Sequence, residues 1–311
     1  MRCMNGRILL FSLILLSSPF IMAGPSYSAK ITQFTISPST VNLPDQDPDL
    51  SPEVSSSTDL TVSFAIRQMN PGENWLLEIA SDGDLMSGSN SIPIGNARWT
   101  VTGMGSGPSS FQNGTFSRGV YIKAGEGGND PFKKADVTCF FRFYLLNLWT
   151  YYTGNYTRII TLRLTVPGDV QPSIFTLSLN LMGRAKLEMG MAGVSFPEAD
   201  PDSVPSIAAS QNPIPVTCSM RTGSALTATL NCLAGGDFIS GTSSILVGNM
   251  RWEATGSGYV AGTMNKTTRQ VAGNWTGSGR FAGAFSFFFA NSWSYNAGNY
   301  STTISYDLIA P

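Results

Sequence analysis

Two short acidic segments have the residue types and spacing to bind a cation. Each places a carboxylate on every second residue: Asp45, Asp47 and Asp49 in the first, and Glu198, Asp200 and Asp202 in the second. Oxygen ligands at alternate positions begin many calcium-binding loops, so the pattern predicts calcium, and the sequence indicates no other cofactor. The alternative is a solvated turn stiffened by Asp-Pro-Asp, because the glycine and the bidentate glutamate of an EF-hand are missing.

The same carboxylates could serve glycoside hydrolysis, which needs two acidic groups, but other features argue against an enzyme. The chain has no histidine, the most common general base and metal ligand. It also contains no CxxC, Walker, Rossmann or GxSxG motif. Because a whole active site is seldom duplicated in series, we predict no catalytic residues and a non-enzymatic protein.

Three cysteines remain once Cys3 is removed with a signal peptide, which is an odd number for an oxidising compartment. Cys218 and Cys232 flank a segment that reads as two alternating strands around a turn near Gly223. This arrangement predicts a cross-strand disulfide between them. The alternative is two small buried thiols that never oxidise. Cys139 is left over and is expected in the core.

An internal duplication organises the chain. At an offset of 153 residues, the 21-residue segment that begins at Gly83 matches the one that begins at Gly236 with 12 identities. The offset falls to 144 at Asn147 and Asn291, so the first copy holds nine extra residues, among them the glycine-rich KAGEGGNDPFKK, a predicted surface loop. The predicted boundaries are a signal peptide at 1–28, repeat 1 at 29–167, a linker with an extra strand at 168–184, and repeat 2 at 185–311.

Every clear hydrophobic period in the chain is the two-residue period of a β-strand. The segment 60–66 places four apolar residues on one face, and 75–79 and the last strand of each copy alternate in the same way. Turn residues recur about every 8 to 12 positions. The sequence therefore predicts an all-β fold of two tandem antiparallel, Ig-like β-sandwich domains. The alternating segment 173–181 either ends the first sandwich or begins the second.

Aromatic residues recur at matched positions in the two copies. Trp99, Trp149 and Tyr156 correspond to Trp252, Trp293 and Tyr300. Matched tryptophans in a sandwich more often fill the core than bind a ligand, so we predict structural roles for these residues. Aromatic runs that begin at Phe140 and Phe285 could bind glycans if their outward residues were aromatic. In the second run three of four phenylalanines share one face, which is typical of a core strand.

The last segment of each copy resembles known domains. Gly-Asn-Tyr at 154–156 and 298–300 resembles the tyrosine corner of immunoglobulin-like sandwiches, which implies a hydrogen bond from the phenol to nearby backbone. The segment SWSYNAGNYSTTISYDLIAP resembles the terminal strands of bacterial secreted pilin-like and spore-coat-U-like domains. That resemblance implies a surface or filament protein that pairs a strand edge with another subunit. Those subunits usually carry one such domain and a different disulfide framework.

The N-terminal segment predicts export. Arg2 and Arg7 precede an apolar run from Ile8 to Leu16, followed by small residues, as in a secretory signal peptide. No later stretch is long and apolar enough to span a membrane. Without the signal peptide, 17 basic and 20 acidic residues remain, so nucleic acid is not an expected partner. We predict a location in the periplasm, on the cell surface or outside the cell.

The expected function is structural or adhesive, with other surface proteins or further copies of the chain as partners. Carbohydrate binding by an accessory module is the alternative. The expected way of binding a partner depends on which sandwich contains the extra alternating strand at 173–181. If it completes the first sandwich, the second should have an unpaired strand edge that can take a strand from a partner.

Overall fold

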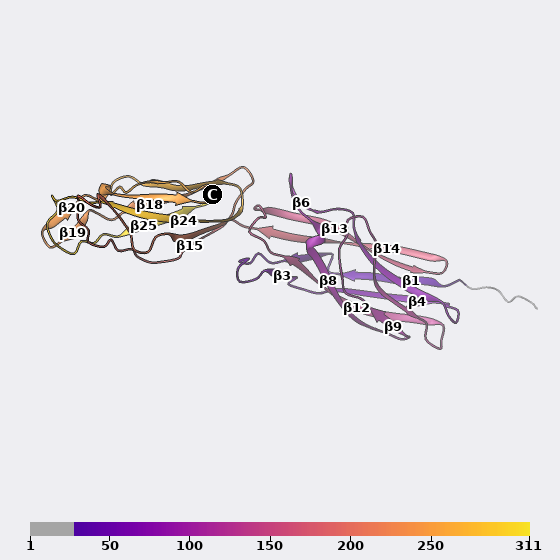
Figure 1. The fold of residues 1–311 in the computed structure, drawn as a ribbon. Helices are drawn as coiled ribbons and strands as arrows, with labels where there is room; N and C mark the ends of the chain where they lie inside the picture. The colour runs from indigo at the N-terminus through magenta and orange to yellow at the C-terminus, as the bar shows by residue number, and fades with distance from the viewer. Residues whose placement is uncertain (1–27) are drawn as a thin grey trace, which may run out of the picture.

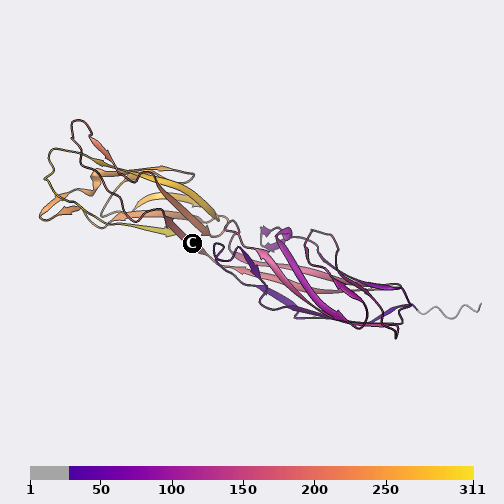
Figure 2. The ribbon, with the colours of Figure 1, turned by 60° about the horizontal axis from the view of Figure 1, so that its bottom comes forward.

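The protein is described by a computed structural model that covers residues 28–311; the predicted signal peptide lies outside them except for Ser28. Its regular structure is β-strand apart from two short 3-10 turns, Ile94–Asn96 and Val247–Asn249. The part of the chain that the structure describes contains no helix able to cross a membrane. The all-β prediction is confirmed. Figures 1 and 2 show two β-sandwiches placed end to end in an elongated molecule.

The first sandwich is made of two sheets around one core. One sheet has the order β1 (Lys30–Ser37), β4 (Leu60–Arg67), β12 (Lys134–Leu146), β8 (Ala97–Gly105) and β10 (Gly114–Thr115), with β3 (Glu53–Ser55) beside β12. The other has the order β2 (Thr40–Leu43), β14 (Asp169–Leu181), β13 (Gly154–Val166), β5 (Asn74–Ser81), β11 (Ile122–Gly128) and β9 (Ser109–Phe111), with β6 (Leu85–Ser87) beside β13 and β7 (Asn90–Ile92) beside β6.

The second sandwich repeats the first sheet of the first sandwich strand for strand. Its order is β15 (Arg184–Met189), β17 (Ile214–Arg221), β24 (Gly279–Ala290), β21 (Met250–Thr255) and β22 (Gly262–Thr263), with β16 (Ser206–Ala208) beside β24. The facing sheet is smaller: β23 (Gln270–Thr276), β18 (Thr227–Ala234) and β25 (Ile304–Ile309), with β19 (Phe238–Ser240) and β20 (Ser243–Ile245) as a separate pair. A second, separate core lies between these sheets.

The extra alternating strand, β14, belongs to the first sandwich. All 13 of its residues pair antiparallel with β13, and Thr176–Leu179 also pair parallel with β2. The segment predicted as a linker is therefore part of the first domain's sheet. The parallel pair of β2 and β14 also departs from the predicted wholly antiparallel arrangement.

The strands form where the sequence alternates because one face of each sheet is buried. In β4, the four apolar residues of the predicted strand at 60–66 are all buried in the first core. In β5, Trp75, Leu77 and Ile79 point into the same core. In β24, Phe285, Phe287 and Phe289 point into the second core, as the shared face of these rings predicts.

Candidate functional site

The first candidate site is the edge of the second sandwich at β25, and the first sandwich shows what normally covers it. There, β14 lies between β2 and β13. Its inward residues are Phe175, Leu177, Leu179 and Leu181, all buried. Phe175 pairs with Ile160 of β13, and the other three pair with 154–158. The inward residues of β13 from Ile160 onward, which are Ile160, Leu162, Leu164 and Val166, are all buried as well.

Among residues 28–311, no strand of the second sandwich takes the position of β14. Within residues 28–311, β25 pairs with β18 alone, and the other side of β25 lies open. The inward residues, at the 144-residue offset from those of β13, are Ile304, Tyr306 and Leu308 of β25 and Ala310 just after it. All four are only half-buried. Val194 and Phe196, at the 153-residue offset from Val41 and Leu43 of β2, are half-buried too and lie outside any strand.

This edge can add one more strand. An unpaired strand presents a row of backbone N–H and C=O groups that a further strand can satisfy. The half-buried side chains of β25 supply the apolar half of the contact, because a strand with apolar residues at alternate positions would cover them. The geometry therefore offers β-strand addition rather than bond-making chemistry.

The second candidate site is a polar junction between the two sandwiches, built on the first acidic segment. The backbone C=O of Asp47 accepts hydrogen bonds from the N–H groups of Leu50 and Ser51, at 3.1 and 2.8 Å. Its carboxylate accepts one from the N–H of Asp49, at 2.9 Å. The amide of Asn147, which follows β12, donates to the C=O groups of Gln46 and Ser51 at 3.0 and 2.9 Å. The segment is thus held as a rigid turn.

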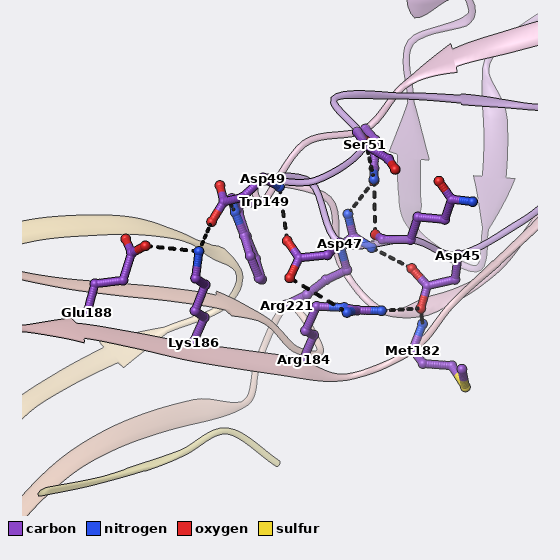
Figure 3. A network of polar contacts seen from close by, with 12 residues as sticks. Asp45, Asp47, Asp49, Ser51, Trp149, Met182, Arg184, Lys186, Glu188 and Arg221 are labelled. Atoms are coloured by element: carbon purple, nitrogen blue, oxygen red, sulfur yellow. Dashed lines mark hydrogen bonds and ion pairs between the residues drawn. The ribbon is translucent and has the colours of Figure 1, made fainter.

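Four basic side chains of the second sandwich bind the three carboxylates of this turn. Figure 3 shows three of them, Arg184, Lys186 and Arg221. Arg221, at the end of β17, donates to Asp45 at 2.7 Å. Lys186 of β15 lies 2.7 Å from Asp49. Arg184 lies 3.8 Å from both Asp45 and Asp47, and Arg280 of β24 lies 2.7 Å from Asp49. None of these cations was predicted from the sequence, because nothing local distinguishes them from surface lysines and arginines.

Arg221 is the buried centre of the junction. Its side chain is 0% exposed, and that of Asp45 is 6% exposed. The guanidinium also donates to the side-chain oxygen of Asn147 at 2.6 Å and to the C=O of Leu148 at 3.1 Å. Burial lowers the pKa of Arg221, and attraction to Asp45 opposes this. A guanidinium stays charged throughout the physiological range, so the junction holds a desolvated ion pair.

The charge on Asp49 is stabilised by hydrogen bonds from Lys186 and Trp149, which lower the pKa of this carboxyl below 3.8. The same contact with Asp49, followed by that with Glu188, raises the pKa of Lys186 to about 12. A lowered carboxyl pKa gives stability that is present above the ordinary value and is lost as the pH falls through the lowered one. The junction therefore keeps this contribution down to about pH 4.

The predicted calcium ligands have different surroundings in the two copies. Asp45, Asp47 and Asp49 face basic side chains of the protein, whereas Glu198, Asp200 and Asp202 are exposed. Among residues 28–311, no group of three or more His, Cys, Asp or Glu side chains is arranged to hold a metal ion. Calcium binding stays a prediction, and at the first turn the ion would have to displace arginine and lysine.

The predicted pairing of the strands that carry Cys218 and Cys232 is wrong. β17 lies in one sheet of the second sandwich and β18 in the facing sheet, so the two strands do not form a hairpin. Both cysteines are buried free thiols, as is Cys139. The predicted disulfide is therefore absent from the structure.

These thiols should be unreactive while the protein is folded. Burial raises the pKa of Cys139 to about 12 and the pKa values of Cys218 and Cys232 to about 11, so almost no thiolate exists at pH 8. For protein that begins at Ser28, we expect no labelling by Ellman's reagent in buffer and three labelled thiols per chain in 6 M guanidinium. Rapid labelling of native protein, or fewer than three thiols after denaturation without reductant, would contradict this expectation.

The predicted structural aromatics divide into buried and exposed residues. Trp99, Trp149, Trp252 and Tyr156 are buried, Tyr300 is half-buried, and Trp293 is 69% exposed. Both tyrosine corners form: the phenols of Tyr156 and Tyr300 each donate, at 3.0 Å, to the C=O of the residue four positions earlier. The prediction that Trp293 fills a core is wrong, and the reason lies in what covers its counterpart, Trp149.

The chain has similarity to solved structures but not to known sequence families. No family model matches the sequence, and no curated protein matches it either. Among solved structures, the chain is similar to the CooA pilin subunit from enterotoxigenic Escherichia coli, with 13% identity and a TM-score of 0.29 over 50% of this chain and 97% of that one.

Two further similar structures extend over most of this chain. One is the complex of CsuC with CsuE, the tip adhesion subunit of Csu pili of Acinetobacter baumannii, with 10% identity, a TM-score of 0.37 and coverage of 88% of this chain and 99% of that one. The other is the CupB6 tip adhesin from Pseudomonas aeruginosa, with 8% identity, a TM-score of 0.31 and coverage of 93% and 92%.

Proposed function

We propose that this protein is a non-enzymatic structural or adhesive component of an exported surface assembly, and that its second domain takes a β-strand from a partner along β25. One observation carries the proposal: the inward residues of β25 are half-buried, whereas their counterparts on β13, which pairs with β14 along its whole length, are buried. The same type of edge is thus completed in one copy and open in the other.

The first sandwich indicates how the partner strand would bind. It would run antiparallel to β25, as β14 runs antiparallel to β13. It would place apolar side chains at four alternate positions, as β14 does from Phe175 to Leu181, and in the register of β14 they would lie beside 298–304, the counterparts of 154–160. Burying them against the second core would remove apolar surface from water, at about 25 cal/mol per Å². Backbone hydrogen bonds to β25 would fix the direction and register of the strand.

A synthetic peptide with the sequence of residues 169–181 tests the proposal on the full mature chain. At a peptide concentration of 100 times Kd, ligation should stabilise the second domain by about 2.7 kcal/mol, seen as a rise in its unfolding temperature by calorimetry. A second peptide with valine at the four inward positions covers the case in which the phenylalanine ring is too large. A third peptide, with serine at those positions, should have no effect.

A pair of substitutions on β25 locates the binding edge. Leu308 faces inward and is half-buried, whereas Ile309 faces outward and is 51% exposed. Leu308→Asp should abolish the response to the peptide, and Ile309→Asp should leave it. If neither apolar peptide changes the unfolding temperature of the unsubstituted chain, or if both substitutions act alike, β25 is not an acceptor edge.

A further inference from the structure

The second acidic segment folds into the same turn as the first, hydrogen bond for hydrogen bond. The C=O of Asp200 accepts from the N–H groups of Ser203 and Val204 at 3.1 and 2.8 Å, and its carboxylate accepts from the N–H of Asp202 at 2.9 Å. The amide of Asn291 donates to the C=O groups of Ala199 and Val204, as Asn147 does in the first copy. The chain therefore builds this polar turn twice.

The two turns differ in what covers them. The indole N–H of Trp149 donates to Asp49 at 3.0 Å and that of Trp293 donates to Asp202 at 3.2 Å, so the two rings have the same local setting. Trp149 is nevertheless 6% exposed and Trp293 69% exposed. The first ring is covered because the second sandwich is docked on its turn, whereas no domain among residues 28–311 lies over the second turn.

The second turn also differs from the first in the basic groups that bind it. In the first turn, the side-chain oxygen of Asn147 accepts from Arg221, and three carboxylates bind arginine or lysine. Within the described part of the chain, the corresponding oxygen of Asn291 has no donor, and Glu198, Asp200 and Asp202 have no basic partner. The first turn binds the buried Arg221, whereas the second turn, which has the same backbone hydrogen bonds, binds no basic side chain of residues 28–311.

The second turn lies at the end of the molecule that is remote from the junction. Its neighbour Trp293 precedes Asn296, whose amide donates to Ser243 of β20. Figure 1 places β19 and β20 at the outer tip of the second sandwich. The first turn occupies the equivalent end of the first sandwich, where the second sandwich begins.

We infer that this second turn, formed by 197–205 with Asn291 and Trp293, is a docking surface for the basic end of a further β-sandwich domain. The inference deepens the proposed function, on which it rests, because it assigns the strand donor and the docked domain to one partner. In the first copy, β14 leads through Met182 and Gly183 directly into Arg184 of β15. A strand bound to β25 in the same direction would likewise end beside the second turn.

The partner is therefore described by its chemistry. It carries a strand with alternating apolar residues, then a link of about two residues, and then a sandwich whose first strand bears basic side chains. These would meet the acidic turn as Arg184 and Lys186 meet the first one. One further arginine, in the place of Arg221, would enter the pocket beside Asn291 and be desolvated there.

An extended chain tests the inference, because Pro311 is the counterpart of Pro167 and a second copy of residues 168–311 can follow it directly. The added copy supplies a strand equivalent to β14 and a sandwich with the four basic residues. We expect the emission of Trp293 to shift to the blue as the ring becomes covered, measured as the difference from a Trp293→Phe version. X-ray scattering should show one rigid particle of three domains in line.

Two control chains separate the inference from the proposed function. A chain extended by residues 168–181 alone should raise the unfolding temperature of the second domain but leave Trp293 exposed. In the longer chain, Asp200→Lys with Asp202→Lys in the original second domain should abolish the emission shift and make the added domain mobile. Glu253→Lys, a charge reversal on β21 of the same domain, should do neither.

The outcomes distinguish the two proposals. If the short extension stabilises the second domain but the long one leaves Trp293 in water and the added domain mobile, the docking surface is refuted and strand addition stands. If the short extension does not stabilise the second domain, strand addition along β25 is refuted, and the docking inference that rests on it is refuted as well. If the added domain docks and the charge reversals at Asp200 and Asp202 make no difference, the acidic turn is not the surface that holds it.

Discussion

Replacing Leu177 with aspartate should unfold the first domain and leave the second folded. Leu177 is fully buried on β14, where it pairs with Arg158 of β13 and Val41 of β2. Removing a buried leucine side chain costs about 2–5 kcal/mol, and an uncompensated carboxylate in its place costs more. The total is comparable with the whole stability of a domain, about 5–15 kcal/mol.

Calorimetry and hydrogen exchange of the full chain would measure this effect, since the two cores are separate. We expect the first domain to lose its unfolding transition and its amide protection at 25 °C, while amides in β17 and β24 remain protected. Asn180→Asp, on the exposed face of the same strand, is the matched control and should change stability by less than about 0.5 kcal/mol. A folded first domain in Leu177→Asp would mean that β14 is dispensable there.

Arg221→Ala should uncouple the two sandwiches. The substitution leaves Asp45 almost buried without its cation and removes the donor to Asn147, a change that typically costs about 3–5 kcal/mol. We expect X-ray scattering to change from a rigid elongated particle to a hinged one, and the second domain to unfold at lower denaturant concentration.

Two further substitutions test whether the buried pair itself is responsible. Arg251→Ala removes an arginine whose side chain is 46% exposed and should change stability by less than about 0.5 kcal/mol. Combining Arg221→Met with Asp45→Leu replaces the pair with apolar side chains and should recover much of the loss, because no charge is then left buried alone. Unchanged scattering and stability in Arg221→Ala would show that the junction does not depend on this arginine.

The features predicted well from the sequence are those set by local pattern. The alternation of apolar and polar residues predicts the inward residues of β4 and β5 correctly, because a strand with one buried face repeats its apolar residues every two positions. The tyrosine corners are also local, since each phenol bonds to backbone four residues away. The extra strand was visible for the same reason, but only the pairing of β14 with β13 shows which sandwich it completes.

The glycine-rich segment is predicted as a surface loop, but its first half lies in strand β11, which pairs with β5 and β9. Its glycines allow neighbouring side chains to lie against the backbone. A Cβ on Gly127 would lie 2.7 Å from the ring of Trp75, and one on Gly125 would lie 3.0 Å from the ring of Phe111. Glycine is read as a turn signal from sequence, whereas here it permits close packing of rings on a strand.

The junction could not be predicted because its partners are distant in the chain. Arg221 lies 176 residues from Asp45, and Arg280 lies 231 residues from Asp49. The spacing of carboxylates predicts calcium, which stays a prediction, and gives no sign of the basic side chains that bind the first turn. The contrast between Trp149 and Trp293 was hidden for the same reason: the sequence shows matched rings, and only the docked domain makes one of them buried.

The placement of β14 also determines how the molecule bears tension. The strand pairs along its whole length with β13, and its last residue leads by a two-residue link into the second sandwich. The described chain enters the first sandwich at the opposite end, where Ser28 bonds to Pro167 beside the β13–β14 turn (Figure 2). A pull along the long axis therefore loads the β14 hydrogen bonds in shear, many at once, so the strand that completes the core is also the tether that transmits force between the domains.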